Sequence, residues 1–104
     1  MSPRIAIDER RIAAFCAKWK ISKLELFGSV LRDDFRPDSD VDLLVTYAPE
    51  VTPDLRQLTE IEEELREILG RDIDLVERRA VEKSDNYIRR REILGAAEAL
   101  YAAG

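Results

Sequence analysis

The sequence predicts an α/β (α+β) fold with a small mixed sheet of three or slightly more strands flanked by helices. Amphipathic helical patterns alternate along the 104 residues with short apolar runs typical of strands. The segment between the first two strand patterns is short for the helical crossover of a parallel pair, so we expect these strands to be antiparallel. No repeat, linker or low-complexity segment interrupts the pattern, and we expect residues 1–104 to form a single domain.

The first half of the chain contains one helical and two strand patterns. Apolar residues at helical spacing predict an amphipathic helix over residues 8–20. Alternating residues predict a short strand over 24–27 that stops at Gly28. The run over 41–47 predicts a second strand, apolar enough to be largely buried beyond its acidic start.

The next helix has clear start and stop signals. Thr52-Pro53-Asp54 combines a hydroxyl cap, a proline at the first helical position and an acid, which predicts a helix start. An apolar helical face follows, and Gly70 is predicted to end the helix in the left-handed conformation.

Two further elements complete the predicted order. Residues 73–76 predict a third strand, and apolar spacing from about 84 to 103 predicts a final helix that contains Tyr101. The whole order is then helix, strand, short helix or turn, strand, helix, strand, helix.

The composition excludes several classes of chemistry. The net charge of −5 makes general binding to a nucleic-acid backbone unfavourable, because that affinity comes from neutralising phosphates. The chain has no histidine, which removes histidine acid–base catalysis, histidine-activated nucleophiles and imidazole zinc sites. The single cysteine, Cys16, cannot form an internal disulfide and is expected to be a small core residue.

Cellular location is predicted from the same features. A lone cysteine fits the reducing cytoplasm. The sequence has no apolar run of the ~20 residues that span a bilayer, and its start lacks a secretory signal pattern. We therefore expect a cytoplasmic protein without a membrane partner.

The most informative motif is Gly28-Ser29 followed, after ten residues, by Asp40-Val41-Asp42. Side chains two apart on a strand point to the same face, so the two aspartates can lie side by side. Such carboxylates repel each other unless a cation lies between them. Oxygen ligands of this kind suit Mg²⁺, which usually arrives carrying phosphates.

The turn beside these carboxylates is suited to an anion. Gly28 lets backbone amides approach a phosphate closely, and Ser29 adds a hydroxyl donor. In an antiparallel pair, the end of the first strand lies beside the start of the second, so the turn and the carboxylates would meet. Each half alone is more often a plain turn or a solvated strand start, but the joint pattern predicts a metal–nucleotide site.

A third carboxylate completes the predicted site. Asp74 lies between Ile73 and Leu75, where an acid is costly unless it is exposed, paired or metal-bound. Asp72, nearer the turn after Gly70, is the competing candidate. Three carboxylates from adjacent strands would make a two-metal site. One ion would lower the pKa of an incoming hydroxyl, and the other would neutralise the triphosphate and the leaving pyrophosphate.

The segments at residues 28–32, 39–45 and 73–76 together resemble the polymerase-beta-type nucleotidyltransferase superfamily. More closely, the chain is similar to the minimal nucleotidyltransferases of prokaryotic toxin–antitoxin modules, the MntA antitoxins paired with HEPN-domain RNases. The resemblance covers nearly the whole chain and implies the polymerase-beta-type nucleotidyltransferase fold.

The resemblance also implies a role for each matching residue. The three aspartates would bind the metals and carry catalysis, and these are Asp40, Asp42 and Asp74. The nucleotide would be bound by the turn and its flanking residues, which are Gly28, Ser29, Arg32 and Ser39.

By resemblance, the activity is transfer of AMP from ATP to a tyrosine hydroxyl of a cognate HEPN toxin, with release of pyrophosphate and two Mg²⁺ ions as cofactors. Two alternatives stay open. One is an antitoxin that neutralises the toxin by binding alone, and the other is a nucleotidyltransferase that modifies a small molecule. The absence of an added substrate-binding domain counts against the small-molecule substrate.

A basic run, Arg89-Arg90-Arg91, lies in the final predicted helix. A solvated helix face explains it most simply. Docking to an acidic partner or to nucleotide phosphates is the functional alternative.

Overall fold

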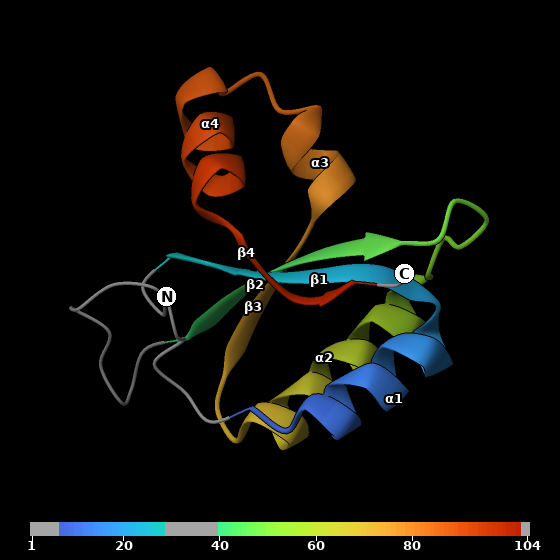
Figure 1. Ribbon diagram of the computed structural model, residues 1–104. Helices are drawn as coiled ribbons and strands as arrows, with labels where there is room; N and C mark the ends of the chain where they lie inside the picture. The colour runs from blue at the N-terminus through green and yellow to red at the C-terminus, as the bar shows by residue number, and fades with distance from the viewer. Residues whose placement is uncertain (1–6, 29–39, 103–104) are drawn as a thin grey trace.

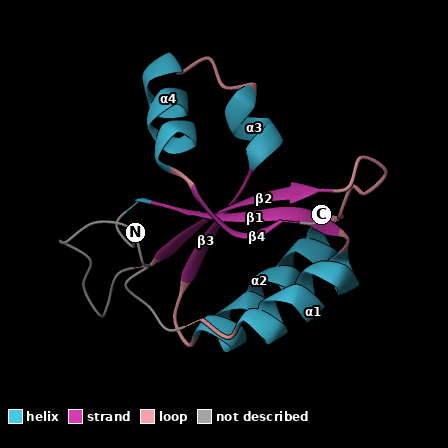
Figure 2. Cartoon of the chain, in the orientation of Figure 1, coloured by secondary structure: helices cyan, strands magenta, loops and turns pink. Residues whose placement is uncertain are grey.

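A four-stranded mixed sheet forms the centre of the computed structural model, which describes residues 7–28 and 40–102 (Figures 1 and 2). The strand order is β3-β2-β1-β4. β2 pairs antiparallel with β1 and parallel with β3, and β4 pairs antiparallel with the other edge of β1. The strands are β1 (Ile21–Phe27), β2 (Val41–Tyr47), β3 (Ile73–Glu77) and β4 (Glu98–Ala102).

Helices cover both faces of this sheet. Figure 1 shows two long helices packed under one face and two shorter helices over the other. The helices of the first face are α1 (Glu9–Trp19) and α2 (Leu55–Leu69). The helices of the second face are α3 (Arg78–Glu82) and α4 (Tyr87–Ala96). The α/β class, the mixed sheet and the antiparallel first strand pair are thereby confirmed.

The predicted final helix is wrong in its second half. α4 ends at Ala96, and Ala97 turns into extended backbone with φ −66° and ψ 135°. The chain then continues as β4, in which Tyr101 pairs with Leu24 of β1. Without β4, the outer edge of β1 would leave backbone groups unpaired, and pairing them outweighs a local pattern that is also compatible with a helix.

The start of α2 also differs from the prediction. Asp54 is the N-cap, rather than Thr52, and Pro53 lies before the helix. The Asp54 carboxylate accepts from the Gln57 backbone N–H at 2.8 Å, and the Gln57 side chain accepts from the Asp54 N–H at 3.0 Å. This reciprocal capping box satisfies two amide donors, which a hydroxyl at Thr52 would not do. The left-handed end at Gly70 is confirmed by its φ of +70°.

Two apolar clusters lie on the two faces of the sheet. The larger one joins α1 and α2 to inward-facing residues of the strands and includes Cys16, whose fully buried side chain confirms its core role. Burial raises the pKa of the Cys16 thiol to about 12, so the reactive thiolate is disfavoured. The smaller cluster lies under α3 and α4 and consists of Phe27, Leu44, Val81 and Ile93.

A buried ion pair fastens α3 to the middle of the sheet. Glu25 of β1 is only 4% exposed, and its Oε1 accepts a hydrogen bond from Arg78 Nη1 at 2.6 Å. Burial alone would lower the pKa of the Arg78 guanidinium. Hydrogen bonds to Glu25 and Glu82 outweigh that effect and hold this pKa above its ordinary value. The Arg78 guanidinium therefore stays charged over any ordinary pH range.

Within residues 7–28 and 40–102, no helix combines the length and the apolar character that a bilayer crossing requires.

We expect Arg78→Leu to lower the free energy of unfolding by about 3 kcal/mol, because the buried Glu25 carboxylate would lose its main partner. Urea denaturation followed by circular dichroism measures this change. Replacing both partners, in Glu25→Leu/Arg78→Leu, should recover much of the loss because no buried charge remains unpaired.

Arg66→Leu is the matched control for this prediction. Arg66 Nε lies 3.9 Å from Asp72 Oδ1, and both side chains are exposed. Loss of this ion pair should lower the free energy of unfolding by no more than about 1 kcal/mol. Equal urea midpoints for Arg78→Leu and Arg66→Leu would show that the buried pair does not hold α3 in place.

Candidate functional site

Gly28 and Asp42 are in direct contact where β1 ends beside the start of β2. Phe27, the last residue of β1, pairs with Asp42 in the antiparallel register. Gly28 follows with a φ of +77°, in the left-handed region that favours glycine. A Cβ built on Gly28 would overlap the Asp42 carboxylate oxygen Oδ2. The missing side chain at position 28 therefore makes room for the carboxylate.

Asp42 and Asp74 are direct neighbours across the parallel strands β2 and β3, where they are register partners. Adjacent strands lie about 4.8 Å apart, and register partners point to the same face of a sheet. Leu43 and Ile73 belong to the cluster under α1 and α2, so alternation places the two carboxylates on the opposite face. Asp42 is partly exposed and Asp74 is exposed, so both side chains reach solvent.

The structure also separates the two candidates for the third acid. The Asp72 carboxylate is 83% exposed and lies 3.9 Å from Arg66 of α2, the helix on the far face of the sheet. Asp72 comes directly before β3, which begins at Ile73. Its backbone carbonyl accepts a hydrogen bond from the Val41 N–H at 3.0 Å. The register with Asp42 therefore favours Asp74.

The other predicted site residues are placed less completely. Asp40 is exposed and comes directly before β2, two residues ahead of Asp42. Ser29, Arg32 and Ser39 lie outside the described residues. The roles assigned to all of these residues stay predictions.

The donor set fits a magnesium ion that arrives with its substrate. Across the described ranges, no three acidic or cysteine side chains are gathered closely enough to hold a metal ion on their own. Mg²⁺ does not require such a cage, because it is usually bound by one or two carboxylates together with substrate phosphates. Asp42 and Asp74 could supply these carboxylates. The absence of a side chain at Gly28 leaves room for the Asp42 carboxylate in its observed position.

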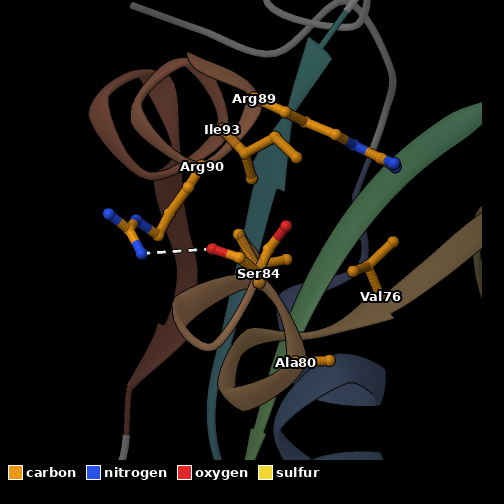
Figure 3. A pocket seen from close by; sticks show the side chains of 7 residues that line it. Val76, Ala80, Ser84, Arg89, Arg90 and Ile93 are labelled. Carbon is orange, nitrogen blue, oxygen red and sulfur yellow. Dashed lines mark hydrogen bonds between the residues drawn. The ribbon is translucent and has the colours of Figure 1, made fainter. Parts of the chain in front are cut away.

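A pocket of about 170 Å³ lies on the same face of the sheet, between α3 and α4. Val76, two residues beyond Asp74 on β3, forms part of its wall. Figure 3 shows Arg89 and Arg90 of α4 at this pocket, with Arg89 extending toward β2 and Arg90 turned toward Ser84. The sequence does not distinguish Arg89, Arg90 and Arg91, because the direction of each side chain depends on how α4 packs on the sheet. The complete lining is Val76, Ala80, Val81, Ser84, Arg89, Arg90 and Ile93.

Comparison with known proteins relates this arrangement to one family. The family model of the nucleotidyltransferase domain matches residues 9–95. Protein adenylyltransferase MntA of Thermococcus cleftensis is 39% identical over 59 residues, which cover 57% of this chain and 58% of that protein. The matched segments of the first curated relatives likewise span about three fifths of those proteins.

Solved structures show the same fold. A candidate minimal nucleotidyltransferase is 32% identical, with a TM-score of 0.64, and the match covers 86% of this chain and 87% of that one. A complex of tri-AMPylated Shewanella oneidensis HEPN toxin with MNT antitoxin matches at 24% identity and a TM-score of 0.60. That match covers 91% of this chain and 70% of the other.

We expect Gly28→Ala to weaken binding of the Mg²⁺–ATP complex by tenfold or more, because the new Cβ would displace the Asp42 carboxylate. Isothermal titration calorimetry with the purified chain measures the affinity.

Gly70→Ala is the matched control, because Gly70 has a similar φ of +70° but open space around its missing Cβ. Both substitutions introduce the same type of backbone strain, which costs roughly 1–2 kcal/mol. Only the new Cβ at position 28 would contact the Asp42 carboxylate. Unchanged Mg²⁺–ATP affinity in Gly28→Ala would rule out a binding role for the Gly28–Asp42 contact.

Proposed function

This chain belongs to the nucleotidyltransferase domain family, and we propose that it is the antitoxin of a toxin–antitoxin pair that silences its partner by AMP transfer. The donor is ATP, the acceptor is a tyrosine hydroxyl of a HEPN-domain toxin, and pyrophosphate is released. The reaction needs Mg²⁺, and Asp40, Asp42 and Asp74 would hold two such ions. The protein acts in the cytoplasm.

The observation that carries this proposal is the register of Asp42 with Asp74 on the open face of the sheet, beside Gly28. A nucleotidyltransferase must hold a triphosphate against carboxylate-bound metal, and these residues supply carboxylates and a close backbone approach together. A purely structural role does not explain two acids in direct register across parallel strands.

The proposed reaction is an in-line displacement at the α-phosphorus. The tyrosine oxygen forms the new P–O bond, and the bond to the β-phosphate oxygen breaks, so the electron pair leaves with pyrophosphate. The tyrosine proton passes to the Asp74 carboxylate. Bound Mg²⁺ supplies neutralisation of the phosphate charge during this step.

Positioning and electrostatics would carry most of the catalysis. The chain has no histidine, so a carboxylate is the available proton acceptor near the phosphates. Holding the hydroxyl and the α-phosphorus in line lowers the barrier without further acid–base groups.

Support for the partner and the acceptor comes from two proteins that this chain resembles. The Thermococcus cleftensis relative is named a protein adenylyltransferase, and the Shewanella oneidensis complex pairs an MNT antitoxin with an AMPylated HEPN toxin. A protein acceptor also fits a site that is open to solvent at Asp74.

We expect Asp42→Asn and Asp74→Asn each to lower AMP transfer roughly a thousandfold or more, because each removes a metal-binding charge. The test is co-expression with the product of the neighbouring gene as the candidate toxin, followed by intact mass spectrometry of that product. Wild type should add one or more AMP masses, and the two variants should add none.

Asp72→Asn is the matched control, since it removes a nearby carboxylate that faces Arg66 instead. It should transfer AMP like wild type. An unmodified toxin that wild type and Asp42→Asn neutralise equally well would instead make this protein an antitoxin that acts by binding alone.

A further inference from the structure

Arg89 points from α4 toward the sheet face that carries Asp42 and Asp74. Arg89 and Ile93 are four residues apart, so they lie on the same side of the helix. Ile93 is buried in the cluster with Phe27 and Leu44, which fixes that side of α4 against the sheet. Figure 3 shows the Arg89 side chain extending toward β2, in agreement with this orientation.

The neighbouring Arg90 is occupied in a structural contact. Its guanidinium donates to the backbone carbonyls of Ser84 at 3.2 Å and Glu82 at 3.4 Å, at the C-terminal end of α3. It also lies 5.6 Å from the centre of the Tyr87 ring. Arg90 therefore ties the end of α3 to α4, and its guanidinium is engaged by these carbonyls.

The Arg89 side chain has no such engagement. Its backbone N–H is bonded to the Asn86 side chain, but its guanidinium forms no hydrogen bond or ion pair with the described parts of the chain. Arg78 of α3, which also lies at this face, is paired with Glu25. Arg89 is thus an exposed cation on the carboxylate-bearing face that is available to a ligand.

The pocket and the carboxylate pair lie on the same face of the sheet and share strand β3. Val76 in the pocket wall and Asp74 are two residues apart on β3, about 7 Å along one face. Phe27, which shares the cluster of Ile93, is the register partner of Asp42. A ligand bound at the two carboxylates therefore lies on the side toward which Arg89 points.

We propose that Arg89 binds phosphate oxygens of the nucleoside triphosphate held at Asp42 and Asp74. This inference rests on the proposed nucleotidyl transfer and adds a nucleotide contact to it. A guanidinium presents paired N–H donors that match phosphate oxygens, and its charge partly offsets the triphosphate. An acidic partner protein would be met more readily by Arg91, which is exposed but does not line the pocket.

The test is the affinity of the purified chain for Mg²⁺–ATP and for Mg²⁺–tripolyphosphate, measured by isothermal titration calorimetry. Arg89→Gln should weaken both ligands roughly tenfold, since charged hydrogen bonds to phosphate are lost. A parallel loss for tripolyphosphate, which lacks base and sugar, assigns the contact to the phosphates. Arg89→Lys should retain part of the affinity through its charge.

Arg91→Gln is the matched control, with the same loss of charge on the same helix, and it should bind both ligands like wild type. Equal affinities for wild type and Arg89→Gln would overturn the Arg89 assignment while leaving the proposed function intact. The Arg89 assignment would also be overturned if Arg89→Gln bound both ligands like wild type but bound the toxin less tightly. Arg89 would then be a contact to the partner protein. Failure of wild type itself to bind Mg²⁺–ATP would overturn the proposed function, and the Arg89 assignment with it.

Discussion

The pairing of β2 with its two neighbours is the constraint on which the candidate site depends. The antiparallel pairing with β1 places Gly28 against Asp42, and the parallel pairing with β3 places Asp74 opposite Asp42. A shift of one residue in either pairing would turn side chains to the other face and separate these groups. The register is held by Leu43 and Val45, which are fully or almost fully buried under the helices.

The two faces of the sheet differ in how much apolar surface they bury. The face under α1 and α2 carries the larger apolar cluster and supplies most of the burial that holds the strands together. Among the residues that the structure describes, the other face is covered only in part by α3 and α4, and the Glu25–Arg78 pair holds α3 to the sheet. This partial cover leaves polar groups accessible at one end of a rigid sheet, which is the arrangement that precise positioning of a substrate requires.

The chemistry follows from what this face offers. Carboxylates, a glycine turn and an unengaged arginine can bind a metal-bound polyphosphate between groups of opposite charge. The absence of histidine from the whole chain is consistent with that scheme, because displacement at phosphorus depends mainly on alignment and charge neutralisation. Under this proposal, one small domain binds the nucleotide and its protein partner brings the acceptor hydroxyl.

The sequence by itself determined the features that depend on local pattern. Alternation and spacing identified β2, the aspartate pair at its start and the antiparallel first strand pair, and Gly70 marked the end of α2. Tertiary structure decided the features for which local patterns are ambiguous. Pairing along the free edge of β1 made residues 98–102 a strand, and strand register separated Asp74 from Asp72. Burial of Ile93 turned Arg89 toward the site, because which side of a helix meets the sheet is settled by packing between distant residues.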